Sequence, residues 1–442
     1  MSVVTLQLGQ CGNQVGLKLF QTLASDLQNE NLPKSKNNQE YVEESLQRFF
    51  HRNDSGGGMT ARAVSVDMET KVIQNTVTEA KKSAKWRYPI GQQFCKKRGA
   101  GNNWADGFYS HGADTVEPVM EMIQKEVEKC DALGGFLALM SVAGGTGSGV
   151  GTCVSQALRD EYPHTVLMNQ LIWPHSSGEV ILQNYNTILS LAHLYQCSDA
   201  ILLIQNDHIR TICSRITNQP NVSLDNMNQI IAHHTASALQ PALNSKSHWQ
   251  TFGDIMKQLV PHADYKLLTL RNVPQVSQES LAFSSYNWPS VLKRLRQMLI
   301  TGVVIEEGMN WHVKVPTSHQ ATPHPAFSRS LANILTLRGK ESSIADTSSF
   351  SDANMYPDWI PGDMALTVCT QNREFCRHEK TATLLGNCQA PVTSLDTVVH
   401  KAWNMFAMRA YVHWYTRYGM AEEEFIDSFA CLEQVVHNYK NL

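Results

Sequence analysis

A glycine-rich stretch, Ala143 to Gly149, most constrains what this chain can fold into. It follows the apolar run 135–142 and precedes residues 150–158, whose pattern predicts a helix. A strand, a glycine-rich turn and a helix in this order present bare backbone amides to an anion. Glycine lacks a Cβ atom, so a phosphate can approach the N–H groups closely. Thr146 and Ser148 add hydroxyl donors, and the stretch therefore predicts a phosphate-binding loop.

Other glycine-rich loops fit this stretch less well. A P-loop requires a lysine, and residues 143–149 contain none. The GxGxxG register of a nicotinamide dehydrogenase fails because residues 150 and 152 are Val and Thr. A nucleophile elbow would need glycines on both sides of Ser148, where Thr146 and Val150 stand instead. An ordinary turn uses only one or two glycines, so this stretch indicates a ligand.

Composition limits the class of protein and its partners. The 442 residues allow two or three domains, and 42% apolar with 17% charged residues is typical of a globular chain in water. We expect no membrane partner, because no apolar run is long enough for a membrane helix and residues 1–8 read as a strand instead of a leader. A net charge of −3 gives no basic surplus, so we expect no nucleic-acid partner.

Strand candidates alternate with helices through the first half of the chain. The candidates are residues 3–8, 63–66, 135–142, 165–173 and 200–204. This alternation predicts an α/β fold with a doubly wound, mostly parallel sheet, which we assign to residues 1–222. Loops that follow parallel strands meet at the carboxyl edge of the sheet, where such folds bind nucleotides.

The second half of the chain predicts three further parts. A helix that begins after Ser223 and is stopped by Pro241 suits a connecting spine, residues 223–242. Strand candidates at 266–270, 312–315 and 365–369 predict a second α/β domain over residues 243–380. Two amphipathic stretches near the end of the chain predict a helical hairpin within residues 381–442.

Polar side chains follow several of the predicted strands. Asp67 and Glu69 come after the second strand, where carboxylates can hold Mg²⁺ through water beside a phosphate, or can simply cap a helix. Asn102 lies in another loop of small residues, 99–104, that offers amide donors, and Asn206 closes the strand at 200–204.

Three separated motifs, in this order, resemble the tubulin superfamily. Residues 9–14 (GQCGNQ) resemble its first nucleotide loop, and residues 143–149 resemble its glycine-rich signature. Residues 410–415 (AYVHWY) are similar to the stretch before its last helix. The resemblance covers nearly the whole chain and implies the tubulin/FtsZ-like fold.

Smaller features indicate one branch of this superfamily. Trp104, the segment 172–174 (IWP) and the ending 438–442 (NYKNL) are most similar to the delta type. That likeness implies a role in the triplet microtubules of centrioles and basal bodies and in cilium assembly. It also implies a location in the cytoplasm, at the centrosome and in the nucleus.

The resemblance further implies GTP or GDP as the ligand, with Mg²⁺ held through water by Glu69. Glu179 would reach the ribose, and Asn206 with Asn228 would read the guanine edge. The implied nucleotide-binding residues are Gln10, Cys11, Gln14, Asp67, Glu69, Asn102, Ser141, Ala143, Gly144, Gly145, Thr146, Gly147, Ser148, Gly149, Glu179, Asn206, Leu224 and Asn228.

Several positions depart from the superfamily pattern. Residue 183 is Gln where the superfamily commonly has Glu. Residue 224 is Leu where a Tyr usually stacks on guanine. Asp254 stands where alpha-type subunits present a catalytic Glu to the nucleotide of the next subunit. It keeps the carboxylate but is one methylene shorter, and it can equally cap a helix that starts at Ile255.

These features leave more than one function open. The first is a GTP-binding structural subunit that assembles end to end, or caps an assembly, with other tubulin-family subunits or centriolar proteins as partners. The second is a self-activating GTPase polymer in which Asp254 completes the neighbour's site in trans. The third is a monomeric GTP-dependent adaptor that does not polymerise.

Overall fold

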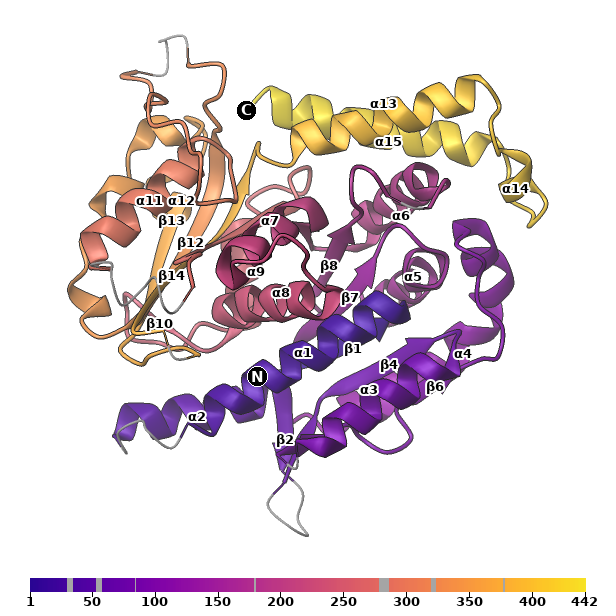
Figure 1. Cartoon of the computed structure of the whole chain (residues 1–442), viewed down its shortest axis with the longest axis horizontal. Helices are drawn as coiled ribbons and strands as arrows, with labels where there is room; N and C mark the ends of the chain where they lie inside the picture. Colours follow the sequence, from indigo (N-terminus) through magenta and orange to yellow (C-terminus); the bar gives the residue numbers. More distant parts are fainter. Residues whose placement is uncertain are drawn as a thin grey trace.

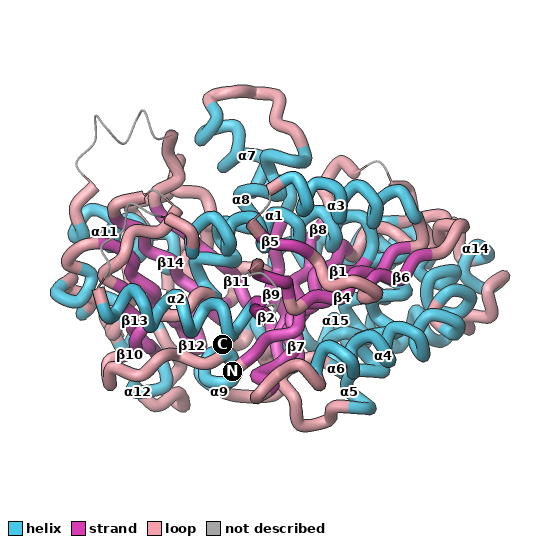
Figure 2. The backbone as a smooth tube through the Cα atoms, turned by 90° about the horizontal axis from the view of Figure 1, so that it is seen from below, coloured by secondary structure: helices cyan, strands magenta, loops and turns pink. Residues whose placement is uncertain are grey.

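One large β-sheet crosses the protein (Figure 1, Figure 2). The computed structural model describes residues 1–29, 35–52, 58–83, 85–178, 180–277, 286–318, 323–376 and 378–442. Within these residues the strand order is β10-β13-β12-β14-β11-β9-β8-β7-β1-β4-β6. The strands are β1 (Ser2–Leu8), β4 (Ala63–Asp67), β6 (Gln93–Cys95), β7 (Leu133–Ser141), β8 (Leu167–Trp173), β9 (Ala200–Gln205), β10 (Leu243–Asn244), β11 (Leu267–Val273), β12 (Ser330–Gly339), β13 (Leu366–Gln371) and β14 (Lys380–Cys388). A smaller sheet joins β2 (Phe50–Arg52), β3 (Met59–Ala61) and β5 (Trp86–Arg87).

The chain reverses its direction of winding at β1. All strands from β6 to β11 in the sheet order are parallel, and β1 lies between β4 and β7, with Leu6 opposite both Val64 and Ala138. From β1 the chain builds outwards to β4 and β6, then returns to β7 on the other side. The predicted α/β fold with a doubly wound, mostly parallel sheet is confirmed, and its topological switch point lies between β1 and β7.

Both faces of this sheet are buried. Along β1, Val4, Leu6 and Leu8 join one apolar cluster and Val3 joins the other. Because both faces are covered, strands such as β7 read as continuous apolar runs. One face is covered by α1 (Gly9–Leu27), α2 (Lys36–Phe49), α3 (Thr70–Lys82), α7 (Asn206–Thr217), α8 (Leu224–Leu239) and α9 (Phe252–Leu259). The other face is covered by α4 (Ala113–Val127), α5 (Gly151–Glu161), α6 (Gln183–Cys197), α11 (Trp288–Ile300), α13 (Val392–Ala407) and α15 (Glu423–Lys440).

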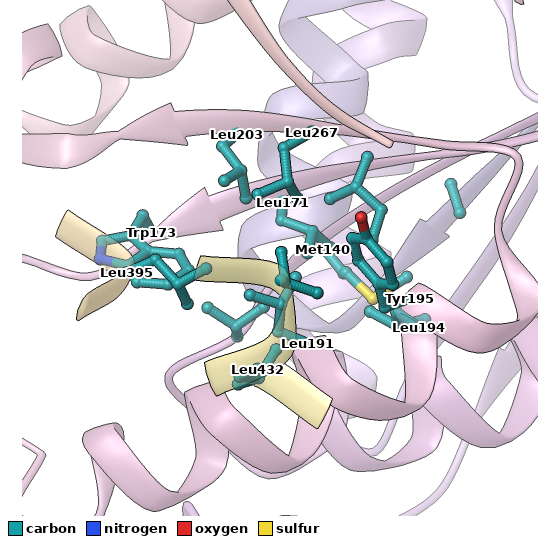
Figure 3. Close-up of a cluster of buried hydrophobic side chains, with 14 of the residues drawn as sticks. Met140, Leu171, Trp173, Leu191, Leu194, Tyr195, Leu203, Leu267, Leu395 and Leu432 are labelled. Atoms are coloured by element: carbon teal, nitrogen blue, oxygen red, sulfur yellow. The ribbon is translucent and has the colours of Figure 1, made fainter. Parts of the chain in front are cut away.

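The predicted helical hairpin is formed by α13 and α15, which lie side by side over α6 (Figure 1). Figure 3 shows the apolar contact between them and the sheet: Leu395 from α13 and Leu432 from α15 approach Leu191 of α6 and Trp173 of β8. The short helix α14 (His413–Thr416) lies in the connection between α13 and α15. The hairpin therefore serves as an outer layer on the face that α6 covers.

The prediction of a strand at residues 312–315 is wrong. This segment is a loop, in which Val313 is buried and its carbonyl oxygen accepts a hydrogen bond from Gln297 Nε2 at 3.2 Å. Strands β12 and β14 complete the sheet instead. Both carry buried polar side chains, such as Asn333 and Asn387, that interrupt their apolar pattern. One sheet joins the strands on both sides of α8, and the boundaries at residues 222, 242 and 380 stay predictions.

The end of α8 is closed by two buried arginines. Arg338, from β12, donates to three carbonyl oxygens of residues 237–241 at 2.6–3.0 Å. Arg48, from α2, donates to the carbonyl oxygen of Leu239 at 2.6 Å. The last carbonyls of a helix lack partners within it and carry its negative dipole end, so cations stabilise them. The two arginines thus fasten this end of α8 to α2 and to β12.

Replacing Arg338 with Met should therefore destabilise the fold. Three buried carbonyl groups would lose their donor, and we expect the free energy of unfolding in urea to fall by about 2–4 kcal/mol. The exposed Arg417, which contacts Tyr418, provides the matched control Arg417→Met. Equal unfolding free energies for the two variants would contradict this account of α8.

Three histidines meet beside α8. The ring of His233 lies 5.4 Å from that of His378 and 6.0 Å from that of His234, measured between centroids. Burial lowers the pKa of all three, and burial together with the charge of His378 lowers that of His234 to about 4. The unfolded chain therefore binds more protons than the folded one between about pH 4 and 6.5. The contribution of His234 to stability is complete above this range and is lost as the pH falls through it.

His234→Gln should flatten this acid dependence. Between pH 7 and pH 4.5, we expect the free energy of unfolding of the variant to fall by about 2–3 kcal/mol less than that of the unmodified chain. Urea titrations at both pH values measure the difference. His312, exposed in the loop that follows α11, provides the control His312→Gln, which removes one histidine and leaves the buried group intact. A parallel pH dependence for His234→Gln would contradict the lowered pKa.

Candidate functional site

The carboxyl ends of β1, β4, β7 and β9 open onto one cavity of about 490 Å³. This is the edge of the sheet, at the switch point, where the sequence predicts a nucleotide site. The predicted residues that line the cavity are Gln10, Cys11, Gln14, Asp67, Glu69, Asn102, Ser141, Gly144, Gly145, Thr146, Gly147, Asn206, Leu224 and Asn228.

Three further predicted contacts, Ala143, Ser148 and Gly149, do not line this cavity. Ser148, expected to offer its hydroxyl to a phosphate, donates it to the carbonyl oxygen of Gly144 and closes the loop on itself. Gly149 packs behind the loop, where a Cβ atom would lie 2.3 Å from the carbonyl oxygen of Trp104. Ala143 also lies behind it, and Glu179 is outside the described residues.

Further lining residues were not among the predicted contacts. The sequence indicates residues 99–101 only as a loop with amide donors, and they line the cavity beside Asn102. Val180 and Met227 also contribute to the wall. Neither lies in a motif, so only the fold shows their position.

The glycines of the loop bring three backbone segments together. Gly9, the first residue of α1, has a φ of +72°, and a Cβ atom there would lie 2.7 Å from the backbone nitrogen of Gly147. A Cβ atom on Gly145 would lie 2.5 Å from the carbonyl oxygen of Ala100. Gly144 differs, because a Cβ atom there would meet only Asn102 Oδ1, at 3.6 Å. Gly145 is therefore required by loop packing, whereas Gly144 has room on its cavity side.

The loop after β7 continues into an uncommon helical turn. Residues Thr146–Val150 form a π-helical turn, η2, that leads into α5, and a second one, η1 (Asp106–His111), packs against it. Single π-helical turns occur frequently at functional sites. The wide turn keeps residues 144–147 at the cavity wall.

Amide side chains reach the cavity from three helices. Gln14 lies on α1, Asn206 begins α7, and Asn228 lies on α8 with its Nδ2 3.5 Å from Gln14 Oε1. Amide groups both donate and accept hydrogen bonds, as the edge of a guanine base requires. Leu224, the first residue of α8, lines the same wall and is 60% exposed.

Two carboxylates lie at the end of β4. Asp67 is buried, and its Oδ1 accepts the backbone N–H of Glu69 at 3.0 Å. Asp67 Oδ2 is also buried and, within the described residues, has no hydrogen-bond partner. Burial raises the pKa of Asp67 to about 6, and the charge of Glu69 adds to the shift. Glu69 precedes α3 without a side-chain bond to its amides, so the capping alternative is not what the structure shows.

These carboxylates fit a cation held through water. The unpartnered Asp67 oxygen can accept a hydrogen bond from a water ligand, and Glu69 is exposed at the cavity wall. No cluster of three His, Cys, Asp or Glu residues in the described ranges could hold a metal ion by itself. Such an ion would therefore need the oxygens of phosphate and water, as Mg²⁺ commonly does.

Asp254 lies away from the cavity of its own chain, in the first turn of α9. Its Oδ2 accepts the N–H of Thr251 at 3.0 Å and the hydroxyl of Thr251 at 2.7 Å, while its own N–H donates to that hydroxyl oxygen at 3.1 Å. This reciprocal pair is a capping box. Asp254 therefore does cap a helix, and this helix begins at Phe252.

A profile of the Tubulin/FtsZ family, GTPase domain, matches residues 2–214 of this chain. The tubulin delta chain of Macaca fascicularis is 46% identical over 454 aligned residues, which cover all of both chains. The chain belongs to the tubulin family. The human tubulin delta chain is 45% identical with the same coverage. By contrast, the tubulin beta-1 chain of Chondrus crispus is 26% identical, over 99% of this chain and 93% of its own length.

These comparisons confirm the resemblance to the tubulin family and its delta branch. They also identify the domain that contains most of the cavity as a GTPase domain, because β1, β4, β7, β9 and the start of α7 lie within the matched range. The chain is therefore a GTP-binding member of the tubulin family. Leu224, Met227 and Asn228 complete the cavity wall from beyond that range.

Gly144 offers a sharp test of phosphate binding at this loop. Because a methyl group fits at Gly144, we expect Gly144→Ala to keep its melting temperature without nucleotide but to bind GTP about tenfold more weakly. Gly145→Ala should instead lower the free energy of unfolding by about 1–3 kcal/mol, because its methyl group would overlap Ala100. Thermal unfolding and GTP titration of both variants separate the two effects. An unchanged GTP affinity in Gly144→Ala would show that phosphates do not approach this loop.

Proposed function

We propose that this chain is a delta-type tubulin subunit that binds GTP at the 490 Å³ cavity and assembles end to end with other tubulin-family subunits, or caps their assemblies. The observation that supports this most is that loops after four parallel strands and amides from three helices line one cavity at the switch point. Full-length identity of 45–46% to tubulin delta chains supports the choice of branch.

In this proposal each wall of the cavity has one task. Backbone amides of residues 9–11, 99–102 and 144–147 bind the phosphates, and Asn206 with Asn228 bind the guanine edge. The resemblance alone assigns the ribose contact to Glu179, which lies outside the described residues. Glu69 and Asp67 hold the water ligands of Mg²⁺, which when bound neutralises phosphate charge.

We further propose a place in the cell and a second candidate. The likeness to delta chains favours centriolar and basal-body triplet microtubules and cilium assembly, with locations in the cytoplasm, at the centrosome and in the nucleus. No helix within the described ranges is long and apolar enough to cross a membrane. The second candidate is a monomeric GTP-dependent adaptor, which the capping box of Asp254 favours because it gives that carboxylate a structural use.

Base selectivity tests the proposed ligand. We expect GTP to displace a fluorescent GTP analogue far better than ATP does, and Asn228→Ala to weaken GTP binding about tenfold because the guanine edge loses a partner. Leu224→Tyr should strengthen GTP binding several-fold through stacking, on the order of 1 kcal/mol. Equal displacement by ATP and GTP would exclude the proposed guanine site.

Hydrolysis tests the proposed assembly. The site of a single chain is incomplete, because Asp254 does not line its own cavity. Supplied by the next subunit, this carboxylate would orient a water molecule for in-line attack on the γ-phosphate, releasing GDP and inorganic phosphate. Turnover per subunit should therefore rise with protein concentration, and Asp254→Asn should lower it at least about tenfold without changing GTP affinity.

Thr251→Ala is the matched control for this variant. It breaks the same capping box but keeps the carboxylate, so it should weaken α9 by about 1 kcal/mol and leave turnover nearly unchanged. A turnover that does not depend on concentration and is insensitive to Asp254→Asn would favour the monomeric adaptor.

A further inference from the structure

A buried asparagine lies directly behind the cavity, on α6. Asn186 is fully buried, and its Nδ2 donates to the carbonyl oxygens of Asn102 at 2.9 Å and Ala143 at 2.7 Å. Its Oδ1 accepts the backbone N–H of Trp104 at 3.0 Å and the hydroxyl of Tyr415 at 2.7 Å. Both donors and both acceptor positions of the amide are thus used. Asn186 does not line the cavity, so it can act on a ligand only through these neighbours.

Three of the four partners, Asn102, Trp104 and Ala143, belong to the loops that form the cavity wall or adjoin it. Asn102 and Gly144, the residue after Ala143, both line it. In a trans peptide the carbonyl and the following N–H point in opposite directions. Because Asn186 holds the carbonyl of Ala143 from behind, the N–H of Gly144 points away from α6, towards the side where Gly144 lines the cavity. The amide of Asn186 therefore fixes the direction of a donor at the proposed phosphate end.

The same asparagine ties these loops to the connection between α13 and α15. The connection makes two further hydrogen bonds besides the one from Tyr415. Asn103 Nδ2 donates to the carbonyl oxygen of Trp414 at 2.9 Å. The hydroxyl of Tyr185 donates to the carbonyl oxygen of Ala410 at 2.9 Å. Residues 410–415 are thus bonded at three points, to Tyr185, Asn186 and Asn103. Asn103 follows the cavity residue Asn102 in sequence, and Asn186 is bonded to Asn102. This connection carries α14, at the end of the hairpin (Figure 1).

We propose that Asn186 is a positioning residue for the phosphate end of the site, and that it couples occupancy of the site to docking of residues 410–415. The inference rests on the proposed binding of GTP at this cavity. A ligand that orders the loops also stabilises the docked connection, and by thermodynamic linkage the docked connection strengthens ligand binding by the same factor. The hairpin thereby senses whether the site is filled.

The first test compares GTP with GMP, which keeps the base, the ribose and one phosphate. Asn186→Ala should weaken GTP binding about tenfold, because the loops lose their common anchor, and weaken GMP binding less than about twofold. A merely structural role would lower both affinities together. Asn184→Ala is the matched control, because Asn184 lies on the same helix and contacts Met405 of the hairpin instead of the loops.

The second test follows hydrogen exchange of the amides of residues 410–415. In the unmodified chain we expect GTP to slow their exchange several-fold, and in Tyr415→Phe we expect this protection to be largely lost while the fold is kept. This variant removes one hydroxyl group and no packing volume, so it remains informative if Asn186→Ala fails to fold. GTP protection of these amides that is unchanged in Tyr415→Phe would overturn the coupling.

The outcomes separate this inference from the function on which it rests. If the unmodified chain binds neither GTP nor GMP, the proposed ligand is wrong and the inference fails with it. If the unmodified chain binds GTP, and Asn186→Ala binds GTP and GMP with the same ratio of affinities as the unmodified chain, only the inference is overturned.

Discussion

The carbonyl groups at the end of α8 are buried, so they need hydrogen-bond donors from the protein itself. The elements that supply these donors are thereby held together at this point of the fold. Arg338 and Arg48 donate to them from β12 and α2, elements that lie far apart in the sequence. Each guanidinium is buried, and neither element could shift without leaving a charge and several carbonyls unpaired. With this end of α8 fixed, its first two turns have a defined position, and they supply Leu224 and Asn228 to the cavity at the switch point.

Local patterns predicted the elements that are buried on both faces. The run at 135–142 and the strand at 3–8 are apolar at successive positions because two helical layers cover them, and both are strands in the structure. Patterns failed where side-chain hydrogen bonds replace apolar contacts. Residues 312–315 alternate between polar and apolar side chains like a strand but form a loop that is hydrogen-bonded to Gln297. In β12 the polar residues Asn333 and Arg338 are buried, so the apolar pattern of this strand is interrupted.

More of the cavity lining than of the surrounding fold could be predicted from the sequence, because most lining residues lie in short motifs that follow strands. What motifs could not give is the direction in which each group points. Ser148 belongs to the glycine-rich signature, but its hydroxyl donates to the carbonyl oxygen of Gly144. Position 145 needs a glycine because a Cβ atom there would overlap Ala100, whether or not a ligand is bound. Asn186 lies in no motif, and its partner Tyr415 is 229 positions away, so nothing in the local sequence indicates that they meet.

In the proposed guanine site, Leu224 has a consequence for the lifetime of a bound nucleotide. It is 60% exposed at the cavity wall and has no aromatic face to offer a base. Differences in affinity between related complexes lie mostly in the dissociation rate. A guanine that rests on Leu224 would therefore leave sooner than one stacked on tyrosine, and the site would exchange its ligand with the surrounding pool. The bound nucleotide would then reflect the current ratio of GTP to GDP in the cell. It would not reflect the time since the subunit joined a filament.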